Sequence, residues 1–531
     1  MNQTKLHTDR NVRPLLLAQL GILAMVSTGC AMMRKDIAAL PQLPAEQIRM
    51  AEDLKLARDG WPEAQWWRRY RDPQLDALMA QALKDAPMMA VARQRVEASR
   101  SYASWVDASS GLLVGLTGSV DRQEVSANGY LGPFYHNAPA AGFTGPWYTE
   151  GTVGLQAGYD FDFWGKDKAR VEAALGLRLA RQAEAAQAEL VLTSRVAQMY
   201  FGTQALYATL DLLEQTRSIE AELVQGHQAR ADRGLEARTA TELARARALE
   251  LDQQISTAQG RLAMLREAIR ALVGAGPDHL SAIHPVPLST QAGQMPSTLG
   301  YELLARRPDL QAMRWYVQAS MSQIQTARAA FYPSFDIRAF YGFDALHTNT
   351  LLSQPSRQIN LVPGLSLPIF DSGRLNAQLA SARTQSNTLI AQYNQAVVDS
   401  VRQVAQSGIE LEDLDRELAT QDAKLKSVAF ARDSAAAHYG RGLVDRLAVL
   451  EAGLPVLAQE GWRVQLRNQQ IHAEIGLTLA LGGGYRTTVD RPGPAPDPHA
   501  AAAPRAQTSS QSIRIGTAYR PSPKPTQASP S

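Results

Sequence analysis

Apolar and polar residues alternate with a period of two in four stretches of the chain. In residues 153–163 every odd position is apolar, and the even positions hold glycine, Gln156, Asp160 and Asp162. The other stretches are residues 112–121, 335–343 and 360–369. This pattern predicts four β-strands, each with one apolar and one polar face. The cleanest stretch has the length of roughly 9–11 residues that a tilted membrane strand needs.

Two long stretches with helical spacing of apolar residues contain no proline: residues 166–233 and 374–441. Each is followed by a second helical stretch that returns from a glycine. Shorter helical stretches, residues 72 to about 108 and 296–330, precede the strand pairs. A helix as long as residues 166–233 extends about 100 Å, which exceeds the size of a compact domain.

The spacing of glycines predicts an internal duplication. In each half of the chain, 69 positions separate the first two glycines of this pattern, and 40 more lead to the third. These residues are Gly165, Gly234 and Gly274, and then Gly373, Gly442 and Gly482. We therefore predict two repeats, residues 61–285 and 286–484, each with a helix, a strand pair, a long helix and a return helix.

Four strands are too few for a membrane barrel, since the smallest have about eight. After residue 30 no stretch has 18 uninterrupted apolar residues, so we expect no transmembrane helix. If the chain spans a membrane, strands from several copies must close one barrel, with the polar faces toward the lumen. The predicted fold class is mainly α with membrane β-strands.

The first 29 residues have the pattern of a secretory signal: basic residues, an apolar run over 15–26 and three small residues. Cys30 follows directly and is the only cysteine, which excludes an intrachain disulfide or a thiolate zinc site. The segment resembles a bacterial lipoprotein signal, although Ser27 stands where that pattern has leucine. We expect cleavage before Cys30 and acylation of its thiol. Residues 30–60 then form a lipid-anchored linker.

Composition excludes several classes of function. The formal net charge is +3 and no basic run carries interleaved aromatics, so we expect no nucleic-acid partner. The nine histidines have no metal-ligand spacing, and no phosphate loop or nucleophile elbow is present, so we expect no enzyme, metal or cofactor. Residues 485–531 are rich in Pro, Ala and Ser and are predicted to be disordered.

Five short motifs, found in order, resemble those of one family. They are Trp66-Trp67 with Tyr70 to Leu75, Asp162 to Gly165, Arg306 to Asp309, Pro368 to Arg374, and Leu481 to Gly484. The chain is similar over residues 61–484 to the outer membrane factor family, the TolC/OprM-like exit ducts of tripartite efflux pumps, in the lipoprotein (NodT-type) branch.

This resemblance implies a homotrimer whose 12-stranded β-barrel continues into a long periplasmic α-helical coiled-coil tube. It implies a lipid-anchored protein of the outer membrane, with a periplasmic adaptor and an inner-membrane pump as partners. The implied function is passive conduction of drugs or small toxic compounds to the exterior. The alternative within this class is the duct of a type I protein secretion system. A soluble coiled-coil interaction protein is a further alternative, but it leaves the four strands unexplained.

The resemblance also implies functional residues. The helix turns are expected to contact the adaptor through Arg233, Gly234, Leu235, Arg441, Gly442 and Leu443. Glu451, nine positions after Gly442, is expected to form a carboxylate ring at the periplasmic aperture, with Asp445 as a second candidate. Ala448 stands where many members have another acid, and the corresponding place in the first repeat is Leu243. A solvated helix face is the alternative explanation for both acids.

Overall fold

The computed structural model describes residues 33–34, 36–43, 61–139, 143–277, 280, 282–289 and 306–486, all within one compact unit. The predicted signal, Cys30, most of the linker and residues 487–531 of the predicted tail lie outside the described residues. The following paragraphs therefore concern only the described ranges.

The two halves of the chain share a helix, two main strands, a long helix and a return helix in the same order. The first half comprises η3 (Trp66–Tyr70), α2 (Pro73–Asp85), α3 (Pro87–Ser109), β1 (Leu113–Glu124), β4 (Trp147–Phe161), α4 (Lys166–Asp232) and α5 (Arg238–Val273). The second half comprises α7 (Pro308–Ala329), β5 (Ser334–Ala345), β6 (Arg357–Ser366), α8 (Arg374–Gly440) and α9 (Arg446–Ala480). The loop between β1 and β4 adds η4 (Gly132–Tyr135), β2 (Asn137–Ala138) and β3 (Phe143–Thr144).

The helical stretch predicted for residues 72 to about 108 consists of two helices, α2 and α3. The Asp72 side chain caps α2 by accepting hydrogen bonds from the backbone of Gln74 and Leu75, with Pro73 in the first turn. The helix then breaks at Ala86, whose ψ of 130° is extended. Pro87 is the cause, because a proline ring disfavours helical backbone in the residue before it.

All six glycines of the repeat have a positive φ, between 70° and 86°. Gly165 and Gly373 precede the long helices α4 and α8, and the other four follow helix ends. A side chain makes this left-handed backbone unfavourable, which glycine avoids. The equal spacing of glycines in the sequence therefore marks the positions where the backbone must reverse.

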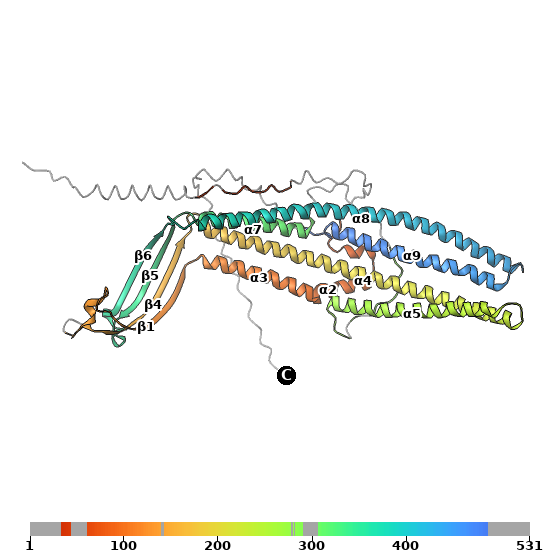
Figure 1. The fold of residues 1–531 in the computed structure, drawn as a ribbon, viewed down its shortest axis with the longest axis horizontal. Helices are drawn as coiled ribbons and strands as arrows, with labels where there is room; N and C mark the ends of the chain where they lie inside the picture. The colour runs from red at the N-terminus through yellow and green to blue at the C-terminus, as the bar shows by residue number, and fades with distance from the viewer. Residues whose placement is uncertain are drawn as a thin grey trace, which may run out of the picture. The chain divides into compact units, whose positions relative to one another are not determined.

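The four main strands form one antiparallel sheet in the order β1-β4-β5-β6 (Figure 1). Leu116 pairs with Leu155, Leu155 with Tyr341, and Tyr341 with Ile359, which gives one continuous row of large side chains. All four are exposed in the single chain. The alternation predicted from sequence thus produces a sheet with a whole apolar face open to its surroundings.

The helices form a single layer in which α4 is central (Figure 1). Near the sheet, α4 packs against α3 through Ala174 and against α7, where Gly176 contacts Ala319. Farther along, α4 packs against α5 and α9. Helix α8 packs against α7 and then α9. None of the described helices is long and apolar enough to pass through a lipid bilayer.

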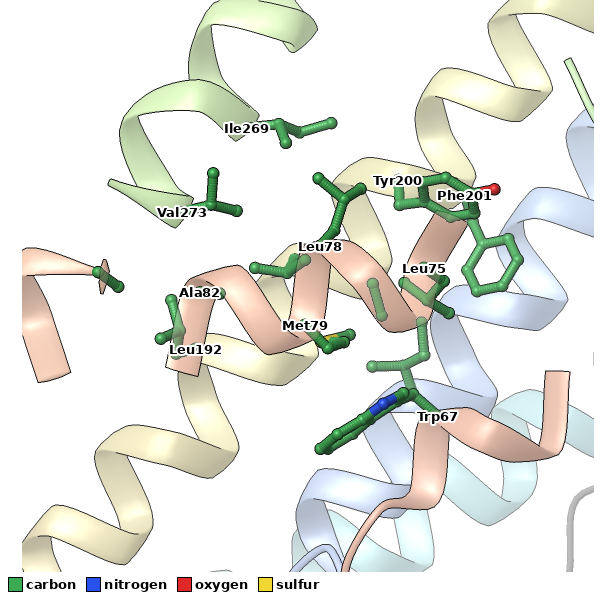
Figure 2. Packing of buried hydrophobic residues seen from close by; sticks show 14 of the residues in the cluster. Trp67, Leu75, Leu78, Met79, Ala82, Leu192, Tyr200, Phe201, Ile269 and Val273 are labelled. Carbon is green, nitrogen blue, oxygen red and sulfur yellow. The ribbon is translucent and has the colours of Figure 1, made fainter. Parts of the chain in front are cut away.

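The main core lies at the middle of the helical layer, where α2 packs onto α4 and α5 (Figure 2). Leu75 and Met79 of α2, Tyr200 of α4 and Ile269 of α5 are fully buried there. The Tyr200 hydroxyl donates a hydrogen bond to the Asp72 carboxylate, which also caps α2. One acid therefore both starts the helix and fixes it on α4.

Arg307, from the third sequence motif, fixes the start of a helix in the second half, although its side chain does not cap that helix. Its guanidinium is buried and donates to Asp309 at 2.6 Å, to Gln403 on α8 at 3.0 Å, and to the carbonyl of Ala480 on α9 at 3.1 Å. It therefore ties the start of α7 to two neighbouring helices.

Candidate functional site

The two helix turns far from the sheet have the same backbone geometry. At the end of α4, Leu235 N–H donates to the carbonyl of Arg230 at 2.9 Å; at the end of α8, Leu443 N–H donates to that of His438 at 3.0 Å. These six-to-one hydrogen bonds, with the positive φ of Gly234 and Gly442, form Schellman motifs that satisfy the last helix carbonyls. The glycines therefore have a structural role that is independent of any partner.

The side chains beside these glycines are available for contact. Arg233 and Arg441 are exposed, and the large apolar side chains of Leu235 and Leu443 are 69% and 68% exposed. An exposed leucine at the end of each helix pair is a suitable anchor for a partner, because burying it removes apolar surface from water. That an adaptor binds there stays a prediction.

Ion pairs join the two helix pairs near these turns. Arg230 on α4 lies 2.6 Å from Asp445, whose second oxygen accepts from the backbone N–H of Ala448 and caps α9. Arg446 on α9 pairs with Glu222 on α4. Asp445 thus has two partners within the chain. This favours a role in linking α4 to α9 over a role in a second carboxylate ring.

Close packing accompanies these charges. A methyl group added at Gly226 of α4 would lie 2.9 Å from the Leu447 side chain of α9, so the absence of a side chain allows the helices to approach. On the same part of α4, His227 lies 2.9 Å from Glu236, which also approaches Arg230 at 3.7 Å. The ends of the two helix pairs are therefore in direct contact.

Glu451 lies on α9, two turns beyond Asp445. It is exposed and forms no hydrogen bond or ion pair with the described residues. Its counterpart Leu243 is 61% exposed on α5. A free, exposed carboxylate is compatible with the predicted ring at the aperture, which stays a prediction.

Sequence reasoning missed the buried acid of this region, Glu220 on α4. Its residue is 4% exposed, its Oε1 is 3.9 Å from Arg247, and its Oε2 accepts no hydrogen bond from the described residues. Burial raises the pKa of Glu220 and Glu451 adds to this, whereas Arg247 and His227 oppose it. One signal in the sequence could have identified Glu220 as buried. Thr216, Glu220 and Leu223 follow the i, i+4, i+7 spacing of the inward-facing residues on α4.

A short N-terminal strap, residues 33–34 and 36–43, runs along α8. Its backbone N–H groups donate to three asparagines of that helix: Arg34 to Asn376 at 2.9 Å, Leu40 to Asn387 at 3.0 Å, and Leu43 to Asn394 at 2.9 Å.

Asp36 is the ionic centre of this strap, because it pairs with Arg328 on α7 and Arg383 on α8, both at 2.7 Å. Burial would raise the pKa of Asp36, but the hydrogen bonds and charges of Arg383 and Arg328 together lower it. The strap begins three positions after Cys30, which itself lies outside the described residues.

No three His, Cys, Asp or Glu side chains of the described residues come together as a possible metal site. The arrangement so far consists of a sheet with an exposed apolar face, a long helical layer, and linked helix ends with exposed leucines.

Comparisons with known proteins match nearly all of this arrangement. A family model described as outer membrane efflux protein matches residues 78–275 and 299–483. The multidrug resistance outer membrane protein MdtP of Shigella flexneri is 49% identical over 474 residues, covering 89% of this chain and 97% of that protein. The putative multidrug resistance outer membrane protein MdtQ of Shigella flexneri is 38% identical over 465 residues, covering 87% and 97%. The crystal structure of the outer membrane protein VceC from Vibrio cholerae has a TM-score of 0.70 at 29% identity, covering 80% of this chain and 100% of that chain.

Proposed function

This chain belongs to the outer membrane efflux protein family, and we propose that it forms the outer-membrane duct through which a tripartite pump expels drugs or small toxic compounds. It is an outer-membrane protein of the channel class, and this family consists of channel proteins. The proposal that the cargo is a drug or small toxic compound rests most strongly on one observation. The chain is similar over nearly its full length to proteins named for multidrug resistance. Those names favour efflux over type I protein secretion.

Outer membrane efflux channels act as trimers, with a barrel that continues into a helical tube. The open edges of this protomer fit that assembly. The sheet ends in β1 on one side and β6 on the other, and the helical layer ends in α3 and α5 on one side and α8 on the other. When the two different edges of neighbouring copies meet head to tail, the copies form a ring if the rotation between them closes. Three copies supply the twelve strands of such a barrel.

The helix ends are the proposed contact with the rest of the pump. A periplasmic adaptor would bury Leu235 and Leu443 and pair with Arg233 and Arg441, and it would connect the duct to an inner-membrane pump. In a trimer, three copies of Glu451 would lie around the narrow end and attract cations. The ion pairs between α4 and α9 would hold this end narrow in the resting channel.

Acylation of Cys30 would anchor each protomer to the membrane. The strap, which begins three positions after the predicted acylation site, holds Arg34 against Asn376 in the first turn of α8. This turn is close in sequence to the end of strand β6 at Ser366, so the strap is attached near the end of the sheet, which supports the proposed anchor.

Ethidium accumulation tests the proposed function. Deleting the gene in its native host should raise intracellular ethidium, and expression of the wild-type chain should restore efflux. A Leu235→Ser, Leu443→Ser double variant should still migrate as a heat-sensitive trimer from outer-membrane fractions but should not restore efflux. Unchanged ethidium levels after deletion, combined with loss of a protein from the culture medium, would instead support protein secretion.

A further inference from the structure

The polar face of the sheet contains an aromatic residue that the pattern of β5 does not predict. Phe335, Ile337, Ala339, Tyr341 and Phe343 lie on the apolar face. Phe340 alternates with them, and it therefore shares the opposite face with Arg338 and Gly342. Across the strands, Phe340 pairs with Gln156 of β4 and Asn360 of β6. An apolar ring therefore stands among polar neighbours.

Two glycines lie beneath this ring. Gly154 and Gly342 are direct partners across β4 and β5, and both are buried. A methyl group added at Gly154 would lie 2.6 Å from Cζ of Phe340, and one added at Gly342 would lie 2.7 Å from the same atom. The ring therefore covers the pair of glycines and lies against the sheet. A residue larger than glycine at position 154 or 342 would displace the ring.

The space beside the ring is open. A hollow of about 770 Å³ lies over the polar face, and Phe340 lines it together with Gln156, Asn360 and Arg338. Within the described residues, Phe340 forms no pair with another aromatic ring. One face of the ring is thus supported by backbone, and the other is available to a molecule in the hollow.

The charges around the hollow favour a cation. Arg338 pairs with Asp336 at 3.0 Å, and Arg170 pairs with Asp167 at 3.2 Å. Asp160 also lines the hollow, and among the described residues it has no ion-pair partner. Asp160 lies four residues along β4 from Gln156, the partner of Phe340, which is about 13 Å along the strand. Its carboxylate therefore leaves a negative charge in the same hollow, at a distance from the ring.

We propose that Phe340 is a cargo-contacting residue of the channel, on whose free face planar aromatic cations stack as they pass, with Asp160 supplying the attracting charge. This inference rests on the proposed function. It adds to that function one residue that selects the cargo. Stacking on a single ring changes affinity by about two- to tenfold, which is weak enough for the cargo to leave again. Three copies in a trimer would repeat the contact around the lumen.

Planar-bilayer recordings of the purified full-length trimer, with ethidium as the probe, test this proposal. The time that each ethidium molecule blocks the current should fall two- to tenfold in both Phe340→Ala and Phe340→Leu, since leucine keeps the bulk but loses the aromatic face. Phe340→Trp should keep or lengthen it. Asp160→Asn should lower the frequency of blocking events, and less so at high salt.

Phe343→Leu is the matched control, because it makes the same change on the apolar face of β5 and should leave the block unchanged. Fluorescence titration of ethidium with the purified trimers provides a second measurement that does not require an open aperture. Block times and affinities in Phe340→Leu equal to those of the wild type would overturn the proposal. Failure of the wild-type chain to restore ethidium efflux in the deletion strain would instead contradict the proposed function.

Discussion

The guanidinium of Arg230 on α4 lies 2.6 Å from a carboxylate oxygen of Asp445, so one ion pair joins the ends of the two helix pairs within a protomer. Both side chains are well exposed, and such pairs contribute less than about 1 kcal/mol. The link is therefore weak enough to break during opening, and several such links together would set the resting width.

Breaking this link should favour the open channel. Asp445→Asn removes the ion pair but retains the cap of α9, because asparagine caps helices as well as aspartate does. The open probability in planar bilayers should rise by up to about fivefold, as expected for the loss of about 1 kcal/mol. Arg233→Ala, a neighbouring arginine outside this pair, is the control and should leave gating unchanged. Equal open probabilities in the wild type and Asp445→Asn would rule out the link.

The buried acid Glu220 should make the contact between the helix pairs sensitive to pH. Its folded-state pKa is raised above the ordinary value of 4.5, chiefly by burial. The packed helices therefore favour the protonated acid. The contribution of Glu220 to the free energy of unfolding is therefore greatest at acid pH. It falls as the pH rises from the ordinary pKa to the raised pKa, and it is constant above the raised pKa.

Glu220→Gln mimics the protonated acid, so it should raise the melting temperature of the purified trimer at pH 8 and have little effect at pH 4. Glu222→Gln is the control on the same helix, since Glu222 is not among the buried residues and pairs with Arg446. A gain in melting temperature that is the same at both pH values would contradict the role of Glu220.

Replacing two nearby glycines of the second repeat with alanine should change the stability of the helix end in opposite directions. Gly442 has a φ of 71°, so Gly442→Ala should destabilise the turn by about 1 kcal/mol. Gly440 ends the helix α8 with no neighbour within 4 Å of an added methyl, so Gly440→Ala should stabilise it by about 0.5–1 kcal/mol. Cleavage by trypsin at Arg441 should become faster in the first variant and slower in the second.

The strap should detach when its ionic centre is lost. Asp36→Ala leaves Arg328 and Arg383 without their partner, and trypsin should then cleave faster after Arg34. Because the pKa of Asp36 is lowered, the wild-type strap should be stable above the ordinary value of 3.8 and should detach only at more acidic pH. Asp399→Ala, which alters a pair within α8 alone, is the control. Unchanged cleavage after Arg34 in Asp36→Ala would contradict this role.

Sequence periodicity predicted the strands and long helices because their residues obey local rules: alternation for a two-faced sheet, and absence of proline for α4 and α8. It did not predict the break at Ala86, since the apolar spacing continues across Pro87. Glycine spacing identified the turns, because left-handed backbone depends on a single residue type.

Contacts between distant segments could not be read from these local rules. Glu220 carries no signal that its carboxylate meets Arg247, and the register that places Gly154 beneath Phe340 depends on how β4 pairs with β5. The predicted domain boundaries, the acylated Cys30 and the adaptor-contacting residues stay predictions.

The two long helices α4 and α8 each continue without interruption over 67 residues, about 100 Å, whereas their neighbours are separate short helices. Each long helix therefore connects the helix ends to the edge of the sheet through one uninterrupted ladder of backbone hydrogen bonds, whereas α2 and α3 are separated at Ala86. We therefore expect a displacement of the helix ends by a partner to reach the sheet through α4 and α8.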